Sequence, residues 1–147
     1  MSRDGTDWGG RAPAFAHLIK WAEMAVRARV ERAIRPLTLS TGQLLLLVVL
    51  EEYKEATSAT LARALHLTPQ AMTTLLKPLE GRGLIGRRPD ESNRRRVLLS
   101  LTGAAERLLD EVRAATPDIE EPLLSPLSVG ERATLRKLLM KIARPFG

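Results

Sequence analysis

Residues 58–101 constrain the fold more than any other part of this 147-residue sequence. They predict a short helix over 58–65, a three-residue corner and a second, longer helix. Thr68 suits the cap of that second helix, and Pro69 suits its first position, where the missing N–H of proline costs nothing. The corner has the length that joins the two helices of a helix-turn-helix unit.

The second helix is expected to have two distinct faces. Its apolar side chains recur at helical spacing and should face the core: Met72, Leu75, Leu76 and Leu79. The opposite face carries short hydrogen-bonding groups and ends in a lysine: Gln70, Thr73, Thr74 and Lys77. Compact amide and hydroxyl groups suit a helix that reads base edges in the major groove, and free N–H groups near Thr68 suit a phosphate. An ordinary solvated face is the alternative interpretation.

A basic hairpin follows this helix, with strands expected over 84–88 and 96–101 and a polar turn between them. Its arginines greatly outnumber its carboxylates: Arg82, Arg87, Arg88, Arg94, Arg95 and Arg96 face Asp90 and Glu91. A ribbon in this position is a wing, whose arginines can enter the negative potential of a minor groove. Alternatively, ion pairs within the hairpin keep it soluble, with Asp90 holding an arginine across the turn. Both interpretations can hold together.

The second strand of the hairpin alternates in part between apolar and polar side chains. Val97, Leu99 and Leu101 are expected to share the face toward the core, which leaves Leu98 on the exposed side.

Helical patterns precede this region. One helix is expected from Pro13 to about Ile34 and is ended by Pro36. A central apolar helix should follow Ser40, which forms a capping-box signature with Gln43. Residues 1–12 are interpreted as a disordered tail.

Two further helices are expected after the hairpin. Thr102 can cap the first, which should end near Ala115, before a proline-broken connection over 116–127. Ser128 and Glu131 form a second capping-box signature for the last helix.

The charge balance favours a polyanionic partner. Lys and Arg number 23 against 17 Asp and Glu, so the formal charge is +6 and the pI is near 10.5. Nucleic acid and an anionic membrane surface are both compatible with this balance. The amino-terminal residues lack the apolar core of a signal peptide, and the longest apolar run, Leu44–Leu50, is far shorter than the ~20 residues of a membrane span. A cytoplasmic location without membrane insertion is therefore expected.

Enzymatic and metal chemistry find little support in the sequence. Without cysteine there is no disulfide, thiolate ligand or thiol nucleophile. The two histidines, His17 and His66, have no spacing to carboxylates that suggests a metal site. His66 falls in the corner between helices, where a turn or phosphate-side role is favoured over that of a base. No enzyme activity and no cofactor are expected.

The segments "LSTGQLLLLVVL" and "SATLARALHLTPQAMTTLLKPLEGRGLIGRRPDESNRRRVLLSLT", with their helical flanks, resemble the MarR-type winged-helix transcriptional regulators. The resemblance covers roughly residues 14–145 in element order and is most specific over residues 79–102. It implies a mainly α fold with a two-stranded β-wing. The winged helix-turn-helix head would occupy 37–102, and dimerisation helices would occupy 13–36 and 103–147.

The resemblance also implies a function. The expected protein is a homodimeric repressor that binds a pseudo-palindromic operator in double-stranded DNA and is released by a small aromatic or anionic effector. Carried over by position, the recognition residues are Pro69, Gln70, Thr73, Thr74 and Lys77, the wing residues are Arg94 and Arg95, and Asp90 is the wing brace. Departures from the family pattern are Pro78, which should kink the last turn of the recognition helix, the Glu-Ser-Asn wing tip, and the absence of a Gly two residues after "LT".

Two interpretations stay open beside this one. His17 and Trp21, four residues apart on the first helix, share a face that either packs against another helix or lines an effector pocket. A winged helix that binds an acidic protein, without specific DNA binding, is the alternative function.

Overall fold

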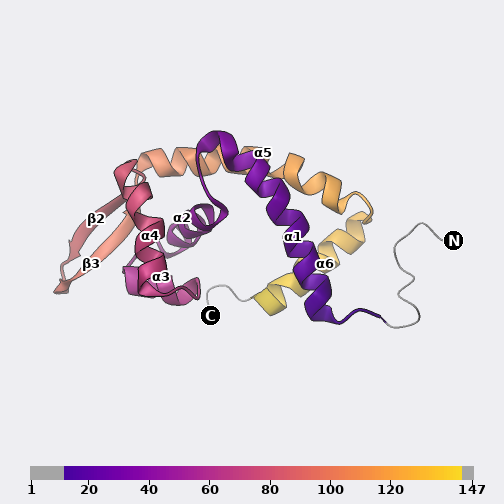
Figure 1. Cartoon of the computed structure of the whole chain (residues 1–147), viewed down its shortest axis with the longest axis horizontal. Coiled ribbons are helices and arrows are strands. Elements are labelled where there is room, and N and C mark those ends of the chain that lie inside the picture. Colours follow the sequence, from indigo (N-terminus) through magenta and orange to yellow (C-terminus); the bar gives the residue numbers. More distant parts are fainter. Residues whose placement is uncertain (1–11, 144–147) are drawn as a thin grey trace.

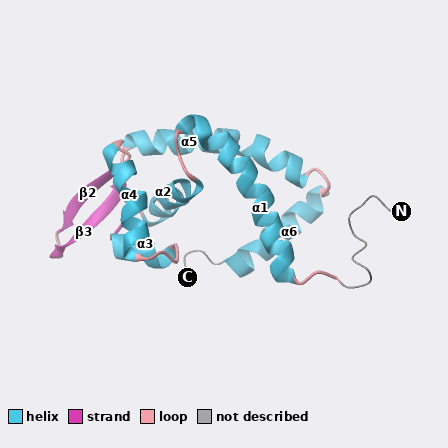
Figure 2. Ribbon diagram, viewed as in Figure 1, coloured by secondary structure: helices cyan, strands magenta, loops and turns pink. Residues whose placement is uncertain are grey.

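A computed structural model describes residues 12–143. Its elements are, in order, α1 (Phe15–Ile34), the 3-10 helix η1 (Arg35–Leu37), α2 (Thr41–Tyr53), β1 (Glu55–Ala56), α3 (Ser58–Ala64), α4 (Pro69–Gly81), β2 (Ile85–Asp90), β3 (Asn93–Leu101), α5 (Gly103–Leu124) and α6 (Val129–Ala143). The fold is mainly helical with a small antiparallel sheet (Figure 2), which confirms the expected fold class. The tail expected over residues 1–12 lies outside the described residues except for its last position.

The elements form a head and a long helical arm (Figure 1). Helices α2, α3 and α4 gather at one end, and the hairpin of β2 and β3 projects from them. Helix α5 leaves the head and runs along the molecule, packed against α1, before the chain turns back into α6. Between 12 and 143, no single helix is long and apolar enough to span a membrane; α1 with η1 and α2 pass that test only together, across a bend of 85°.

The buried apolar residues form one core inside the head. It is built around α2, whose Leu46, Leu47 and Leu50 are fully buried, as expected for a central helix wrapped by others. Residues of every other head element join them, and Ile34 and Leu109 extend the core to α1 and α5. Each fully buried leucine stabilises the fold by about 1.5–3 kcal/mol. The arm therefore joins the head through a shared core.

The predicted helix starts are confirmed by their caps. Ser40 and Gln43 form both bonds of a capping box, at 3.1 and 3.0 Å, and Ser128 and Glu131 form another. Thr68 Oγ1 accepts the N–H of Ala71 at 3.1 Å, with Pro69 as the first helical residue. Helix α4 then continues through Pro78 to Gly81.

The sheet has the strand order β1-β3-β2, and both pairings are antiparallel. Strands β2 and β3 are longer than predicted, so the turn between them shortens to Glu91 and Ser92. Strand β1 was not predicted, because two residues are too few to show an alternating pattern. Its Glu55 pairs with Ser100 and its Ala56 with Leu99, so β1 closes the inner edge of the ribbon.

The prediction that Val97 faces the core is wrong. Val97 is 41% exposed and Leu98 is half-buried, whereas Leu99 is 1% exposed. Val97 pairs with Pro89, farther out along the ribbon than the residues of β3 that pair with β1. The ribbon therefore reaches beyond the core, and Leu99 is the residue that fastens it.

The prediction that a helix ends near Ala115 is also wrong. Helix α5 continues to Leu124 through Pro117 and Pro122. Each proline removes one backbone N–H from the helix, at a cost of about 3 kcal/mol in a helix interior. Packing of α5 against α1 offsets this cost, and the Thr116 hydroxyl donates to the Val112 carbonyl at 3.0 Å. Tertiary contacts thus override the local preference.

Replacing Pro117 with Ala is expected to raise the free energy of unfolding by about 1–3 kcal/mol, because it restores a helix hydrogen bond. Urea unfolding at matched protein concentration measures the change. Pro69→Ala is the control: at the first helical position proline removes no helix hydrogen bond, so no comparable gain is expected. Equal gains in the two variants, or a lower stability of Pro117→Ala, would contradict this account.

Candidate nucleic-acid interface

Helix α4 separates its two faces as the sequence predicts. Met72, Leu76 and Leu79 are buried and Leu75 is half-buried. The side chains predicted to read DNA are all exposed: Pro69, Gln70, Thr73, Thr74 and Lys77. The exposed face is therefore free to meet a partner.

The corner between α3 and α4 is closed by its own backbone. Leu67 N–H donates to the Ala62 carbonyl at 2.8 Å and His66 N–H to the Arg63 carbonyl at 3.2 Å. His66 has a left-handed backbone conformation, with φ of 52°, and its side chain is exposed. In this structure His66 is a turn residue, and Thr68 starts α4 directly after the corner.

The two threonines on the exposed face have their hydroxyl protons engaged. Thr73 Oγ1 donates to the Pro69 carbonyl and Thr74 Oγ1 to the Gln70 carbonyl, each at 3.0 Å. Outward they therefore present oxygen lone pairs and methyl groups. Such groups can accept from the amino group of adenine or cytosine, or touch the methyl group of thymine.

Three arginines of the hairpin region are committed to the fold. Arg88 forms two bonds of 2.6 Å with the Glu55 carboxylate, and these lower the pKa of Glu55. Arg87 pairs with Glu80 at the end of α4. Arg82 donates to two backbone carbonyls at the end of η1 and just after it. The partners of these arginines lie outside the hairpin, so the contacts anchor its inner end to the head and are not the ion pairs within the hairpin that the sequence suggested.

The arginines at the outer end of β3 differ from these. Arg94 and Arg95 are exposed, and the described residues offer their side chains no hydrogen-bond or ion-pair partner. Arg96 is exposed in the same way, although it was not among the predicted wing residues. In the sequence, only its place in the Arg-Arg-Arg run indicated that it belongs with Arg94 and Arg95. Arg94 and Arg95 are therefore exposed cations without a side-chain partner among the described residues, whereas the charge of Arg96 acts on Asp90.

Asp90 organises the turn through Ser92. Its Oδ1 accepts from the Ser92 hydroxyl at 2.6 Å and from the Ser92 N–H at 2.9 Å. These bonds, with the charge of Arg96 as a smaller contribution, hold the pKa of Asp90 below its usual value. The contact within the turn is thus to a serine, where the sequence suggested an arginine across the turn.

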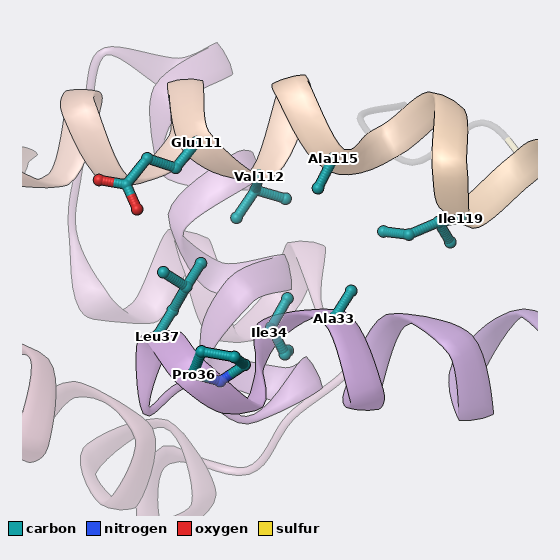
Figure 3. A pocket seen from close by; sticks show the side chains of 8 residues that line it. All are labelled: Ala33, Ile34, Pro36, Leu37, Glu111, Val112, Ala115 and Ile119. Atoms are coloured by element: carbon teal, nitrogen blue, oxygen red, sulfur yellow. The ribbon is translucent and has the colours of Figure 1, made fainter.

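A small cavity lies where the arm meets the head (Figure 3). It has a volume of about 170 Å³, and α1, η1 and α5 line it with Ala33, Ile34, Pro36, Leu37, Glu111, Val112, Ala115 and Ile119. Glu111 is the only charged residue among these. Within residues 12–143, no group of three His, Asp or Glu is placed to hold a metal ion.

His17 and Trp21 lie elsewhere on α1. Their rings stack with centroids 6.2 Å apart and planes at 27°, so the two residues do share a face. Trp21 precedes Ala33 by twelve residues, which is about 18 Å of helix. Within one chain the structure does not bring these two residues to the cavity.

A helix-turn-helix with an exposed amide and hydroxyl face, beside a ribbon that ends in unpaired arginines, defines the class: this is a winged helix-turn-helix protein. Residues 39–97 match the family model described as the MarR family. The chain belongs to the MarR family of transcriptional regulators.

Relatives of known name agree with this assignment. An HTH-type transcriptional repressor of Mycobacterium tuberculosis is 29% identical over 128 residues, covering 87% of this chain and 92% of the relative. The HTH-type transcriptional repressor NicR of Pseudomonas putida is 26% identical over 126 residues, covering 86% and 80%. These relatives are regulators, which agrees with the expectation that this chain is not an enzyme.

Solved structures share the fold. A probable transcriptional regulator from Pseudomonas aeruginosa is 30% identical with a TM-score of 0.74, covering 88% of this chain and 96% of that one. MarR from Escherichia coli in its apo form has a TM-score of 0.81 at 23% identity, covering 90% and 98%. A mutant of the same MarR, complexed with operator DNA, has a TM-score of 0.75 at 24% identity, covering 87% and 92%.

Replacing Ser92 with Ala should raise the pKa of Asp90 toward the usual value of an exposed aspartate, because the hydroxyl of Ser92 supplies the main hydrogen bond to this carboxylate. A lowered folded-state pKa stabilises the turn above the unfolded pKa, and this stabilisation is lost as pH falls through the folded pKa. Carboxyl-carbon NMR titration of both proteins measures the shift. An unchanged Asp90 pKa would show that Ser92 does not hold this carboxylate.

Proposed function

We propose that this chain is a cytoplasmic, homodimeric repressor that binds a pseudo-palindromic operator in double-stranded DNA. The observation that supports this proposal most strongly is that the exposed polar face of α4 and the unpaired Arg94 and Arg95 of the wing belong to the same head. Residues 37–102 form the DNA-binding head, and residues 13–36 and 103–147, of which 144–147 lie outside the described residues, form the dimerisation region.

The exposed face of α4 suits the major groove. The Gln70 amide can pair bidentately with adenine, and the Thr73 and Thr74 oxygens can accept from base amino groups because their protons are already engaged. Lys77, at the end of this face, can reach a guanine edge or a phosphate. Thr68 opens the helix toward a phosphate of the DNA backbone.

The wing suits the adjacent minor groove. Arg94 and Arg95 have no internal partner to give up, so binding to DNA costs them no broken ion pair. A narrow minor groove concentrates negative potential and attracts such side chains. Arg87 and Arg88, in contrast, are neutralised by Glu80 and Glu55 and anchor the ribbon to the head.

The arm leaves apolar surface that a second copy can cover. Helix α6 contains no buried residue within the described chain, although it carries several large apolar side chains. The exposed apolar residues of α6 are Val129, Leu138, Leu139, Met140 and Ile142, and those of α1 include Phe15, Leu18, Ile19 and Met24. Extensive exposed apolar surface on two helices marks an association site. A two-fold dimer would present two heads to a palindromic site.

The cavity between α1, η1 and α5 is the candidate effector site. An engineered apolar cavity of about 150 Å³ in another protein holds benzene, so about 170 Å³ suits a single small ring. Glu111, the one charged residue of the lining, is exposed at its edge (Figure 3), and the lining offers no cation that would bind an anionic compound. Of the aromatic and anionic effectors that the family resemblance suggested, this cavity supports the aromatic class.

Selection of bound sequences from a random pool of duplexes tests the function. We expect enrichment of a pseudo-palindrome with half-sites about one helical turn apart. Recovery of no enriched sequence, together with binding to an acidic protein instead, would contradict the proposal.

Replacing Gln70 with Ala should reduce discrimination between the selected duplex and random DNA by about 1–3 kcal/mol, because alanine cannot form the bidentate pair with a base. Titration of both proteins with both duplexes measures the difference. His66→Ala in the corner is the control, with discrimination expected to stay unchanged. If Gln70→Ala keeps the full discrimination, α4 does not read bases as proposed.

Replacing Arg94 with Ala should weaken duplex binding and reduce the slope of log affinity against log salt by about 1 for each phosphate that Arg94 neutralises. Arg88→Ala is the matched control in the same hairpin, because Glu55 already neutralises Arg88. Affinities measured between roughly 50 and 200 mM salt give both slopes. A slope that is the same for Arg94→Ala and the wild-type protein would mean that Arg94 does not bind a phosphate.

A further inference from the structure

Arg82 makes the longest-range hydrogen bonds at the recognition helix. It is the C-cap of α4, and its guanidinium reaches back 44 and 45 residues to the link between α1 and α2. Nη1 donates to the Thr38 carbonyl at 2.8 Å and Nη2 to the Leu37 carbonyl at 2.9 Å. The two ends of the planar fork are therefore both used.

Both sides of this contact have a fixed backbone. Thr38 is left-handed, with φ of 53° and ψ of 43°, and its N–H closes η1 on the Arg35 carbonyl at 3.0 Å. After Arg82, Gly83 has φ of 69°, and Leu84 N–H donates to the Leu79 carbonyl at 2.9 Å. These bonds end α4 at a defined place. The donor thus stands at the defined end of α4, and the two acceptor carbonyls lie on backbone that η1 holds.

The contact joins the end of the recognition helix to the start of the head, directly after α1 and η1. Arg82 ends the helix proposed to read DNA, whereas Leu37 and Thr38 follow closely on the proposed dimerisation helix α1. Leu37 also lines the cavity (Figure 3), so its carbonyl binds Arg82 while its side chain borders the cavity. No carboxylate partner of Arg82 is found among the described residues, and its side-chain bonds are both to backbone oxygens.

We infer that Arg82 is a positioning residue: the clasp formed by its two bonds to the Leu37 and Thr38 carbonyls fixes the orientation of α4 relative to α1. In a dimer this orientation sets the separation of the two recognition helices, and therefore the half-site spacing that the protein accepts. The inference about spacing rests on the proposed function. Arginine suits this contact because its planar guanidinium presents two N–H donors in fixed directions, whereas a lysine ammonium on a flexible stem can bind the same carbonyls without fixing their direction.

The test compares Arg82→Lys with the wild-type protein. The chain has no cysteine, so Lys77→Cys introduces one labelling site on α4 of each protomer. Spin labels at this site report the separation of the two heads by pulsed dipolar spectroscopy, without DNA. We expect one narrow distance distribution in the Arg82 protein and a clearly broader or shifted one in Arg82→Lys.

Binding to duplexes gives a second readout, with Lys77 intact. The probes are the duplex selected by the wild-type protein and versions with one base pair inserted or removed between the half-sites. If the productive orientation falls to about a tenth of the population, affinity for the selected duplex falls about tenfold. The ratio of affinities between native and altered spacing should shrink as well, while discrimination within each half-site stays as in the wild-type protein.

The control is Arg107→Lys, which changes an exposed arginine of α5 in the same way and should alter neither readout. Circular dichroism confirms folding, and Arg82→Gln replaces the lysine variant if that variant does not fold. An unchanged distance distribution or an unchanged spacing ratio overturns the inference. Failure of the wild-type protein to select any duplex would instead overturn the proposed function, while a broadened distribution would still support the clasp.

Discussion

The packing of α4 on α2 determines what the molecule can present to a partner. Because Met72, Leu76 and Leu79 are buried against the core, the residues half a turn away are forced outward. The fit is close: a Cβ on Gly42 of α2 would lie 3.3 Å from the Leu75 side chain. Rotating α4 to expose different residues would bring its buried apolar side chains into water, so the reading face is fixed by the core beneath it.

Whether an arginine near this helix has a partner in the fold depends on its distance from the core. Arginines near the core find partners in the fold: Arg82 the carbonyls at the end of η1, Arg87 the end of α4, and Arg88 strand β1. Arg94 and Arg95, farther out on the ribbon, form no ion pair with a carboxylate among the described residues. The arginines of the hairpin region therefore divide into an anchored part and a part available to DNA. Exposed ion pairs contribute little stability, so the anchored pairs matter more for orientation.

Local rules in the sequence predicted much of this arrangement. Caps depend on residues three positions apart, so Ser40, Thr68 and Ser128 mark their helices before any tertiary contact is known. The two faces of α4 follow from the 3.6-residue period alone. For these elements the sequence-based predictions agree with the structure in detail. Features that depend on distant segments escaped prediction. Strand β1 exists because Glu55 and Ala56 find β3, and α5 continues through Pro117 because α1 packs against it.

Side-chain partners and the cavity escaped prediction for the same reason. The partners of Arg82 and Arg88 lie 44 and 33 residues away, respectively, and no spacing rule links them. The cavity arises where α1, η1 and α5 meet, far along α1 from the aromatic pair that the sequence singled out.

The salt dependence of duplex binding by the unmodified protein tests the central claim most directly. If two protomers each place Arg94 and Arg95 against phosphates, log affinity should fall linearly with log salt, with a slope of about −3.6 or steeper. A flat response would contradict the assignment of the wing and α4 to DNA, and would point to a protein partner for the same surface.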